Sequence, residues 1–165
     1  MLGLNHKIGF IVDGKSKLPR GKIAIVVAKF NEFVTKRLLD ACLDELTKNG
    51  VKAKNIIVLW VPGAFEIPIV AKQIAEKKDV SGVICLGAVI RGETKHYDLV
   101  ADNTARGIMD VALAVNKPII FEVLAVDTME LAYKRSEEKG INKGRDAAQA
   151  LLEVLDVAGQ IEKIK

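Results

Sequence analysis

KIAIVVAKF, residues 22–30, decides the fold of this 165-residue chain. The run is apolar and rich in β-branched side chains, which is typical of a strand covered on both faces in a parallel sheet. Three later runs resemble it, namely residues 55–61 (NIIVLWV), 82–90 (GVICLGAVI) and 118–126 (PIIFEVLAV). The sequence therefore predicts four buried strands.

Helical patterns follow each of these strands. After Thr35, apolar residues at positions 39, 42, 43 and 46 recur with helical spacing, and Asn49-Gly50 ends the pattern. Apolar stripes predict further helices after Pro62-Gly63, after the loop 91–97, and over residues 128–139 and 143–157. Such alternation predicts right-handed crossovers. The expected fold is α/β: a flavodoxin-like, three-layer α/β/α sandwich around a four-stranded parallel sheet.

The amino-terminal region departs from the alternation. Residues 7–12 (KIGFIV) read as a short strand, and residues 13–21 (DGKSKLPRG) read as a loop because turn residues dominate them. An isolated strand has to pair, so we expect it at an edge of its own sheet or at a subunit interface. We divide the chain into an N-terminal strand and basic loop (1–21), one domain (22–158) and a C-terminal tail (159–165).

Positive charge gathers in the same region. Residues 1–22 hold five lysines and arginines against Asp13 alone, whereas acids and bases balance over the rest of the chain. A basic arm either contacts nucleic acid or an anionic lumen, or is solvated. The solvated arm is the favoured interpretation, and no nucleic-acid partner is predicted.

The two cysteines and the hydropathy pattern narrow down the class of protein further. Cys42 falls in a predicted helix and Cys85 in a predicted strand, where both read as small buried apolar residues. No apolar run approaches the roughly 18 residues needed to cross a bilayer, and no signal peptide opens the chain. We expect a cytoplasmic protein with no membrane partner.

Candidate functional residues gather where the predicted strands end. Ligands of open parallel sheets bind beyond the carboxyl ends of the strands. That rule selects residues 30–32, 62–66, 91–96 and 127–128. In the third stretch, His96 has the unperturbed pKa for proton transfer near neutrality, or it merely caps a helix. No Cys or second His has metal-ligand spacing with it, so no metal site is predicted.

The other candidates each have a structural alternative. Arg91, Gly92 and Thr94 precede a helix and either hold a phosphate or form an ordinary helix start. Glu66 either accepts hydrogen bonds from a polyol or, as an acidic residue in the first helical turn, interacts favourably with the helix dipole. Phe30 either stacks on a planar ring or packs in the core. Arg135 either binds phosphate or carboxylate, or belongs to a charged helix end before the cationic loop 139–145.

Several common motifs are absent. No GxGxxG follows the first strand and no Walker sequence occurs, which argues against dinucleotide and nucleoside triphosphate binding. A phospho-receiver domain needs acidic residues after its first and third strands, where this chain has Phe30-Asn31-Glu32 and Arg91-Gly92. From these patterns alone, the chain is a doubly wound domain with a small-anion site.

Five stretches taken together resemble the lumazine synthase family. They are KFNEFVT (29–35), VPGAFEIP (61–68), GAVIRGETKHYD (87–98), PIIFEVLAVDT (118–128) and NKG (142–144). The likeness runs from about residue 22 to 157. It implies the condensation of 5-amino-6-(D-ribitylamino)uracil with 3,4-dihydroxy-2-butanone 4-phosphate to 6,7-dimethyl-8-ribityllumazine, with release of phosphate and water. It implies no cofactor and no metal ion.

The same resemblance implies roles for residues of this chain. Phe30 would stack on the pyrimidine, and Glu66 would accept hydrogen bonds from the ribityl hydroxyls. His96 would move protons, and Arg135 would bind the phosphate together with the segment Gly92, Glu93 and Thr94. The remaining substrate-binding residues implied are Asn31, Ala64, Phe65, Val89, Ile90, Phe121 and Lys143.

Assembly is part of what the likeness implies. Phe121, Arg135 and Lys143 would reach the site from an adjacent subunit of a homo-oligomer, a pentamer or larger, with the sixty-subunit shell left open. A functional link to riboflavin synthase also follows. Glu93 departs from the small residue common in the family, and Glu122 departs as well. Two other classes stay open: a scaffold that has lost turnover, and a flavin- or pteridine-binding module.

Overall fold

Four parallel strands form the sheet of the computed structural model, which describes residues 10–164. Their spatial order is β2 (Ile56–Val61), β1 (Lys22–Ala28), β3 (Val80–Ile90) and β4 (Ile119–Val126). Each boundary lies within two residues of its predicted position. The predicted four-stranded parallel sheet is confirmed, with β1 and β3 at its centre.

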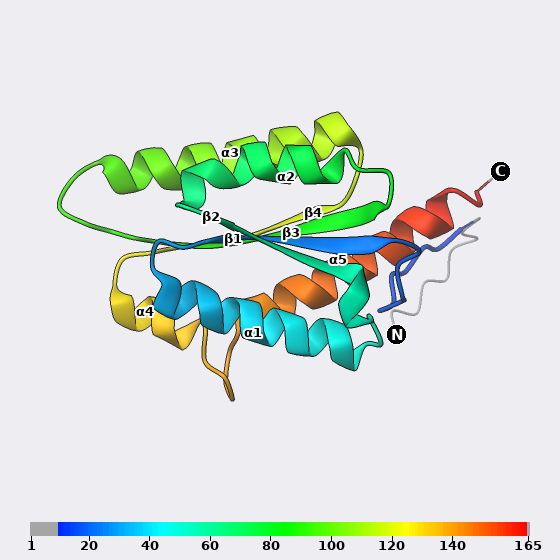
Figure 1. The fold of residues 1–165 in the computed structure, drawn as a ribbon, viewed down its shortest axis with the longest axis horizontal. Helices are drawn as coiled ribbons and strands as arrows, with labels where there is room; N and C mark the ends of the chain where they lie inside the picture. The colour runs from blue at the N-terminus through cyan, green and yellow to red at the C-terminus, as the bar shows by residue number, and fades with distance from the viewer. Residues whose placement is uncertain (1–9, 165) are drawn as a thin grey trace, which may run out of the picture.

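Helices cover both faces of the sheet (Figure 1). One face carries α2 (Ile67–Ala75) and α3 (His96–Val115). The other carries α1 (Glu32–Lys48), α4 (Met129–Lys134) and α5 (Lys143–Ile161). Short 3₁₀ turns, η1 (Ala53–Asn55) and η2 (Ala64–Glu66), flank β2. This is the predicted α/β/α sandwich. Within residues 10–164, no helix is both long and apolar enough to span a membrane.

The strand β1 explains why the sheet lies in the middle. Its side chains alternate between two cores, with Ile23, Ile25 and Val27 facing α1 and α5, and Ala24 and Val26 facing α2. The two cysteines are part of these cores, as predicted. Burial raises the pKa of the Cys42 thiol to about 12 and raises the pKa of Cys85 as well. Both are therefore uncharged core side chains at neutral pH.

The first helix begins earlier than the sequence indicated. The prediction placed Thr35 before the helix, but α1 starts at Glu32 and Thr35 lies buried inside its first turn. The Thr35 hydroxyl donates to the Ala28 carbonyl at 2.8 Å, so it ties the helix to the end of β1 instead of capping it. Asn31 occupies the N-cap in the left-handed conformation, with φ 59°. The chain thus passes from the end of β1 at Ala28 to the start of α1 at Glu32 through residues 29–31.

The predicted helix 128–139 was too long, and the predicted helix 143–157 was too short. The helix α4 ends at Lys134, because the Ser136 hydroxyl donates to the Ala132 carbonyl and the chain then turns back on itself. Residues 136 and 142 form an antiparallel bridge across this turn. The buried Asn142 caps α5 by accepting from the Gly144 amide at 2.9 Å. At its other end, α5 continues to Ile161, into the segment interpreted as a tail.

The loop 13–21 is docked on the body of the protein. It contains neither helix nor strand, as predicted. The Lys15 amide donates to Asp156 at 3.1 Å, and the Lys17 ammonium pairs with the same carboxylate at 3.2 Å. Gln160 donates to the Asp13 carbonyl. Residues 7–9 of the predicted strand 7–12 lie outside the described residues, and residues 10–12 join no strand of this chain.

Close packing of α1 against α5 rests on Gly144. A Cβ atom at this position would collide with the backbone carbonyl of Leu38, whereas a Cβ at Gly159 in the same helix would meet nothing within 4 Å. We expect Gly144→Ala to lower the free energy of unfolding by about 3 kcal/mol because backbone cannot give way cheaply. Gly159→Ala should raise it by about 0.5–1 kcal/mol through the better helix propensity of alanine.

Urea unfolding followed by circular dichroism measures both changes. Equal midpoints for Gly144→Ala and the parent chain would mean that the α1–α5 crossing is looser than described.

Candidate functional site

The carboxyl ends of the strands bring the candidate loops together. Backbone amides of Lys29 and Phe30 donate to the carbonyls of Val61 and Pro62, so the β1 and β2 exits run side by side. The Arg91 amide donates to the Val126 carbonyl at 2.9 Å, which joins the β3 and β4 exits. The four stretches selected from the sequence thus share one edge of the sheet, at the left in Figure 1.

Two phenylalanines stand exposed at neighbouring strand ends. The side chain of Phe30 is 70% exposed and that of Phe65 is 58% exposed. An apolar ring of this size in water is costly unless something covers it. Core packing of Phe30, the alternative drawn from the sequence, is therefore not what the chain does. Ala64 and Val89 are buried beneath this surface, and Ile90 is half-buried at the end of β3.

Asn31 holds the turn after β1 in place. Its side-chain amide donates to the Ala88 carbonyl at 2.8 Å, which fastens the turn to the neighbouring strand β3. The left-handed backbone at this position is one that asparagine tolerates better than most residues. Asn31 thereby positions Phe30 next to the end of β3.

Glu66 works as a helix-start residue in the free chain. One of its carboxylate oxygens accepts from the Gly63 amide at 2.9 Å and closes the turn η2. This matches the structural alternative for Glu66. The carboxylate is exposed, and its second oxygen has no hydrogen bond among the described residues. Glu66 is thus held in a fixed place and keeps accepting capacity.

Arg91 forms ion pairs with Asp98 and Asp127, which could not be predicted from the sequence. Its guanidinium donates to Asp127 at 2.8 Å and to Asp98 at 3.1 Å, and it lies over the ring of Tyr97. Hydrogen bonds to Asp127 and Asp98 raise its pKa. Asp127, placed among the candidates by its strand-end position, therefore serves to hold Arg91. The interaction braces the loop 91–95 against the end of β4.

The start of α3 carries the polar groups of this edge. Gly92, Glu93 and Thr94 are exposed, and the His96 amide donates to the Thr94 hydroxyl at 3.3 Å. His96 is the first residue of α3, so its exposed imidazole stands at the positive end of the helix dipole. Free amides, a hydroxyl and an imidazole at one helix start suit an anionic, proton-exchanging ligand.

The remaining predicted residues lie elsewhere, around the outer edge of β4. Phe121 is 43% exposed on that strand. Arg135 follows α4 and Lys143 opens α5, and the Lys143 amide donates to the Arg135 carbonyl. Through Cys85, Phe121 is in register with Val26, four residues before Phe30. The Cα atoms of Phe30 and Phe121 are thus separated by about 15 Å. One chain therefore contains two groups of candidate residues that do not share a pocket.

Glu122 is a titratable residue of the second group that received no role from the sequence. It lies half-buried on β4, on the α5 side of the sheet. Its pKa is raised to about 7, chiefly by burial, with Lys143 lowering the pKa and the nearby Asp146 raising it. Lys143 itself pairs with Asp146 at 2.8 Å, which raises the pKa of the ammonium. A proton on Glu122 near neutrality thus alters the charge beside Lys143.

The raised pKa of Glu122 predicts a pH-dependent stability. Because the folded chain keeps this proton to about pH 7 and the unfolded chain loses it near 4.5, stability falls as pH rises between these values. We expect Glu122→Gln to flatten this slope and to gain about 2 kcal/mol over the parent above pH 7. Denaturant unfolding at several pH values measures it. Parallel pH profiles for parent and variant would show that the Glu122 carboxyl is solvated and that its pKa is not raised.

Fold and site together define a doubly wound α/β protein whose exposed aromatic and polar candidate residues gather at the carboxyl edge of its sheet. The chain belongs to the 6,7-dimethyl-8-ribityllumazine synthase family, whose model matches residues 20–158.

Individual members of the family are similar in sequence to this protein along most of its chain. A 6,7-dimethyl-8-ribityllumazine synthase from Protochlamydia amoebophila is 46% identical over 92% of this chain and 88% of its own length. The protein of the same name from Pediococcus pentosaceus is 49% identical over 86% of this chain and 91% of its own. That from Leuconostoc mesenteroides is 46% identical over 87% and 92% respectively. The resemblance drawn from the five sequence stretches is confirmed.

Proposed function

We propose that this protein is a lumazine synthase enzyme of riboflavin biosynthesis. It condenses 5-amino-6-(D-ribitylamino)uracil with 3,4-dihydroxy-2-butanone 4-phosphate to give 6,7-dimethyl-8-ribityllumazine, phosphate and water. Family membership supports the reaction. The observation that carries the site assignment is the pair of exposed rings, Phe30 and Phe65, at adjacent strand ends above the fixed carboxylate of Glu66.

The pyrimidine and its ribityl chain bind at the first group of residues. Phe30 covers one face of the ring, and Ile90 with the end of Val89 lines the pocket. Glu66 accepts from ribityl hydroxyls through its unused oxygen, while Phe65 and the backbone at Ala64 flank the chain. Asn31 contributes by fixing the turn. Stacking and a charged acceptor together select a planar ring with a polyol tail.

The sugar phosphate binds between the start of α3 and Arg135. The amides at Gly92 and Glu93 and the Thr94 hydroxyl donate to phosphate oxygens, and the Arg135 guanidinium supplies charge. The Glu93 carboxylate points to solvent in this arrangement, since a second negative charge beside the phosphate would weaken binding. Lys143 and Phe121 close the ring pocket from the same side as Arg135.

Catalysis is mainly a matter of alignment. The pyrimidine amine attacks the ketone carbonyl, loss of water forms an imine, and phosphate departs. The ribityl-bearing amine then attacks the remaining carbonyl, and loss of a second water completes the ring. Holding the amine against the ketone removes most of the entropic barrier. His96 takes a proton from the attacking amine and returns one to the departing groups, which is worth about 10²–10⁴-fold.

The two separated groups meet only if two subunits share each site. Phe121, Arg135 and Lys143 of one subunit then face Phe30 and His96 of its neighbour. The surface of α3 supports such an assembly, because Leu99, Met109 and Leu113 are each more than half exposed on it. The edge of β4 beyond β3 is also unpaired within residues 10–164. We propose a homo-oligomer, a pentamer or larger.

The reaction is tested by mixing the full-length protein with both substrates and following the fluorescence of the lumazine product. We expect turnover by the parent chain and a loss of about 10²-fold or more in kcat/KM for Arg135→Ala, because a charged phosphate contact is removed. Lys72→Ala removes one exposed cation from α2 and should leave turnover unchanged. A well-folded oligomer without product would instead favour the scaffold or the flavin-binding module.

Sharing of the site is tested by complementation. His96→Ala damages one half of every site and Arg135→Ala damages the other half. When the two inactive variants are unfolded together and reassembled, about a quarter of the shared sites should regain both residues by random assortment. Activity well above the sum of the separate variants is the expected result. Activity that stays at that sum would place both residues within one subunit.

A further inference from the structure

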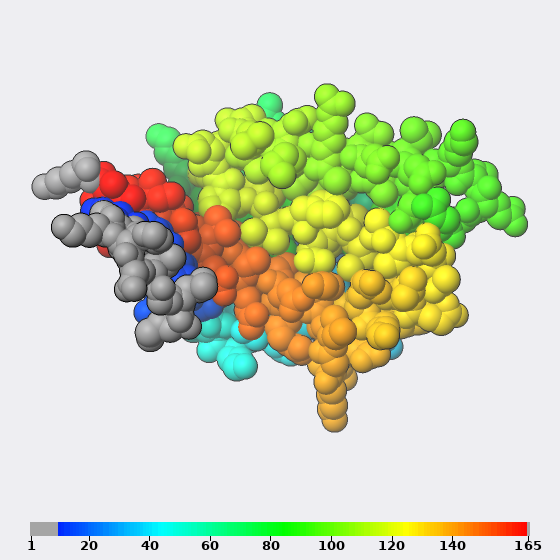
Figure 2. All heavy atoms as spheres, turned by 180° about the vertical axis from the view of Figure 1, so that it is seen from behind, coloured from blue at the N-terminus to red at the C-terminus, as the bar shows by residue number. Residues whose placement is uncertain are grey.

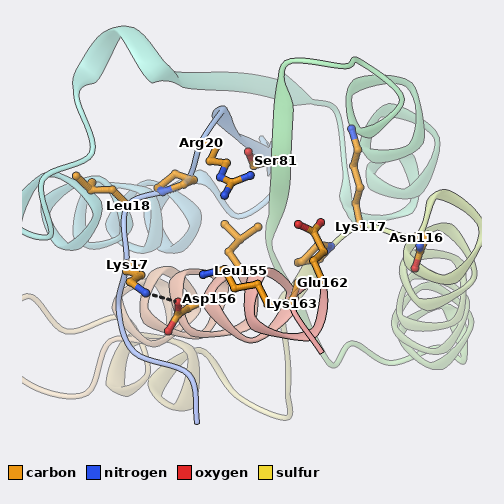
Figure 3. A pocket seen from close by; sticks show the side chains of 14 residues that line it. Lys17, Leu18, Arg20, Ser81, Asn116, Lys117, Leu155, Asp156, Glu162 and Lys163 are labelled. Carbon is orange, nitrogen blue, oxygen red and sulfur yellow. Dashed lines mark ion pairs between the residues drawn. The ribbon is translucent and has the colours of Figure 1, made fainter. Parts of the chain in front are cut away.

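A cavity of about 540 Å³ opens at the opposite end of the sheet from the candidate active site. Its walls come from the loop 13–21, the starts of β3 and β4, and the last turns of α5 (Figure 3). Residues 17–19, 159, 162 and 163 of this wall lie outside the range that matches the family model. The volume lies within the range of small-molecule sites.

Four cationic side chains line this cavity, and two of them are already engaged. Lys17 pairs with the Asp156 carboxylate at 3.2 Å, which anchors the loop to α5. Lys117 donates to the carbonyls of Ala75, Lys77 and Val80, all between 2.7 and 2.8 Å, and so uses its three protons. These two residues build the wall. They are not available as principal donors to a ligand.

Arg20 and Lys163 have no ion pair among residues 10–164. Figure 3 shows the Arg20 side chain entering the cavity near Ser81. The Ser81 hydroxyl accepts from the Gly21 amide at 2.9 Å, which leaves its own hydrogen free to donate. Two acids, Asp156 and Glu162, line the cavity beside the four cations, and Glu162 has no ion pair among residues 10–164, so positive charge is in excess.

The arrangement around Arg20 is held by the backbone. A Cβ atom on Gly21 would come within 2.6 Å of both the Asp79 carbonyl and the Ser81 hydroxyl. The chain can therefore pass this closely only because residue 21 is glycine. The Lys22 amide also donates to the Asp79 carbonyl at 2.7 Å. Arg20 is thus attached to a fixed segment next to the start of β3.

We propose that this cavity binds a small organic phosphate, at a site separate from the active site. The Arg20 guanidinium and the Ser81 hydroxyl hold the phosphate group, and Lys163 adds charge from the turn that follows α5. The lining also includes Leu18, Pro118 and Leu155, whose apolar side chains are available to the organic part of the ligand. Charged donors together with apolar side chains in one cavity select a phosphomonoester over a bare anion.

The proposed cavity site lies far from the place where the sugar phosphate is proposed to bind for catalysis. The strand β1 runs seven residues from the cavity end to the Phe30 end, which is about 20 Å. Arg135 and His96 lie at the far end. One ligand cannot contact both, so variants at one end should leave the other end intact.

The test uses isothermal titration of the full-length protein with adenosine 5′-monophosphate, adenosine and inorganic phosphate at low ionic strength. We expect the monophosphate to bind more tightly than phosphate, and adenosine not to bind. Arg20→Gln should weaken the monophosphate about tenfold, because a charge-assisted hydrogen-bonding group is lost. Lys163→Gln should weaken it less, and Lys72→Gln, the matched control, should leave it unchanged.

Arg135→Ala identifies the site that is being titrated. Monophosphate binding that persists in Arg135→Ala and drops in Arg20→Gln supports the cavity. The proposal is overturned if binding drops only in Arg135→Ala, if adenosine binds as well as the monophosphate, or if no variant of the cavity changes the affinity. Circular dichroism of Arg20→Gln shows whether the fold is kept, and Ser81→Ala provides a second variant without a change of charge.

Discussion

Burial of β1 and β3 on both faces is the constraint on which the rest of the molecule depends. Each strand needs a helical layer above and below because its alternating side chains enter two separate cores. Parallel pairing with β2 and β4 then forces all four strands to leave the sheet at the same edge. A chain built in this way has one edge rich in strand exits and one edge rich in strand entries.

The exit edge suits catalysis because its loops are short and cross-braced. Asn31 fastens the β1 exit to β3, and Arg91 fastens the β3 exit to the residue that follows β4. Such bracing allows Phe30 and Phe65 to stand exposed without collapsing inward. The edge strand β4 differs from the other strands, because its Phe121 is exposed and two cationic residues, Arg135 and Lys143, lie beside it. The proposed sharing of sites between subunits would explain both features with one arrangement.

The entry edge carries different chemistry. There the basic loop is held by Asp156, and it encloses a cavity instead of lying free in solvent. Charge that looked excessive in the sequence is partly neutralised by α5 and partly directed inward at Arg20. Figure 2 shows the same loop region against the end of α5 from behind. An enzyme of this fold thus has room for a second ligand without disturbing its catalytic edge.

Much of this molecule was readable from its sequence. Runs such as residues 22–30 determine a doubly covered parallel strand, because burial on both faces demands an uninterrupted apolar segment. The strand-end rule selected Phe30, Glu66 and His96 as candidates, the charged segment before residue 139 singled out Arg135, and the resemblance implied a role for each. Local chemistry misplaced the helix boundaries at Thr35 and after Lys134. At Thr35 the hydroxyl bonds to the carbonyl of Ala28 at the end of β1, and after Lys134 the Ser136 hydroxyl bonds back to the Ala132 carbonyl.

Long-range pairings were decided by the tertiary structure alone. The partners of Arg91, the docking of the loop 13–21 on Asp156 and the raised pKa of Glu122 depend on residues far apart in the chain. The separation of Phe30 from Phe121 likewise follows from strand order, which periodicity does not encode. Hydrophobic pattern and turn chemistry are local properties, so the sequence by itself determined the elements and their layers. Which charges meet is a property of the folded chain, because it depends on the distances that folding sets.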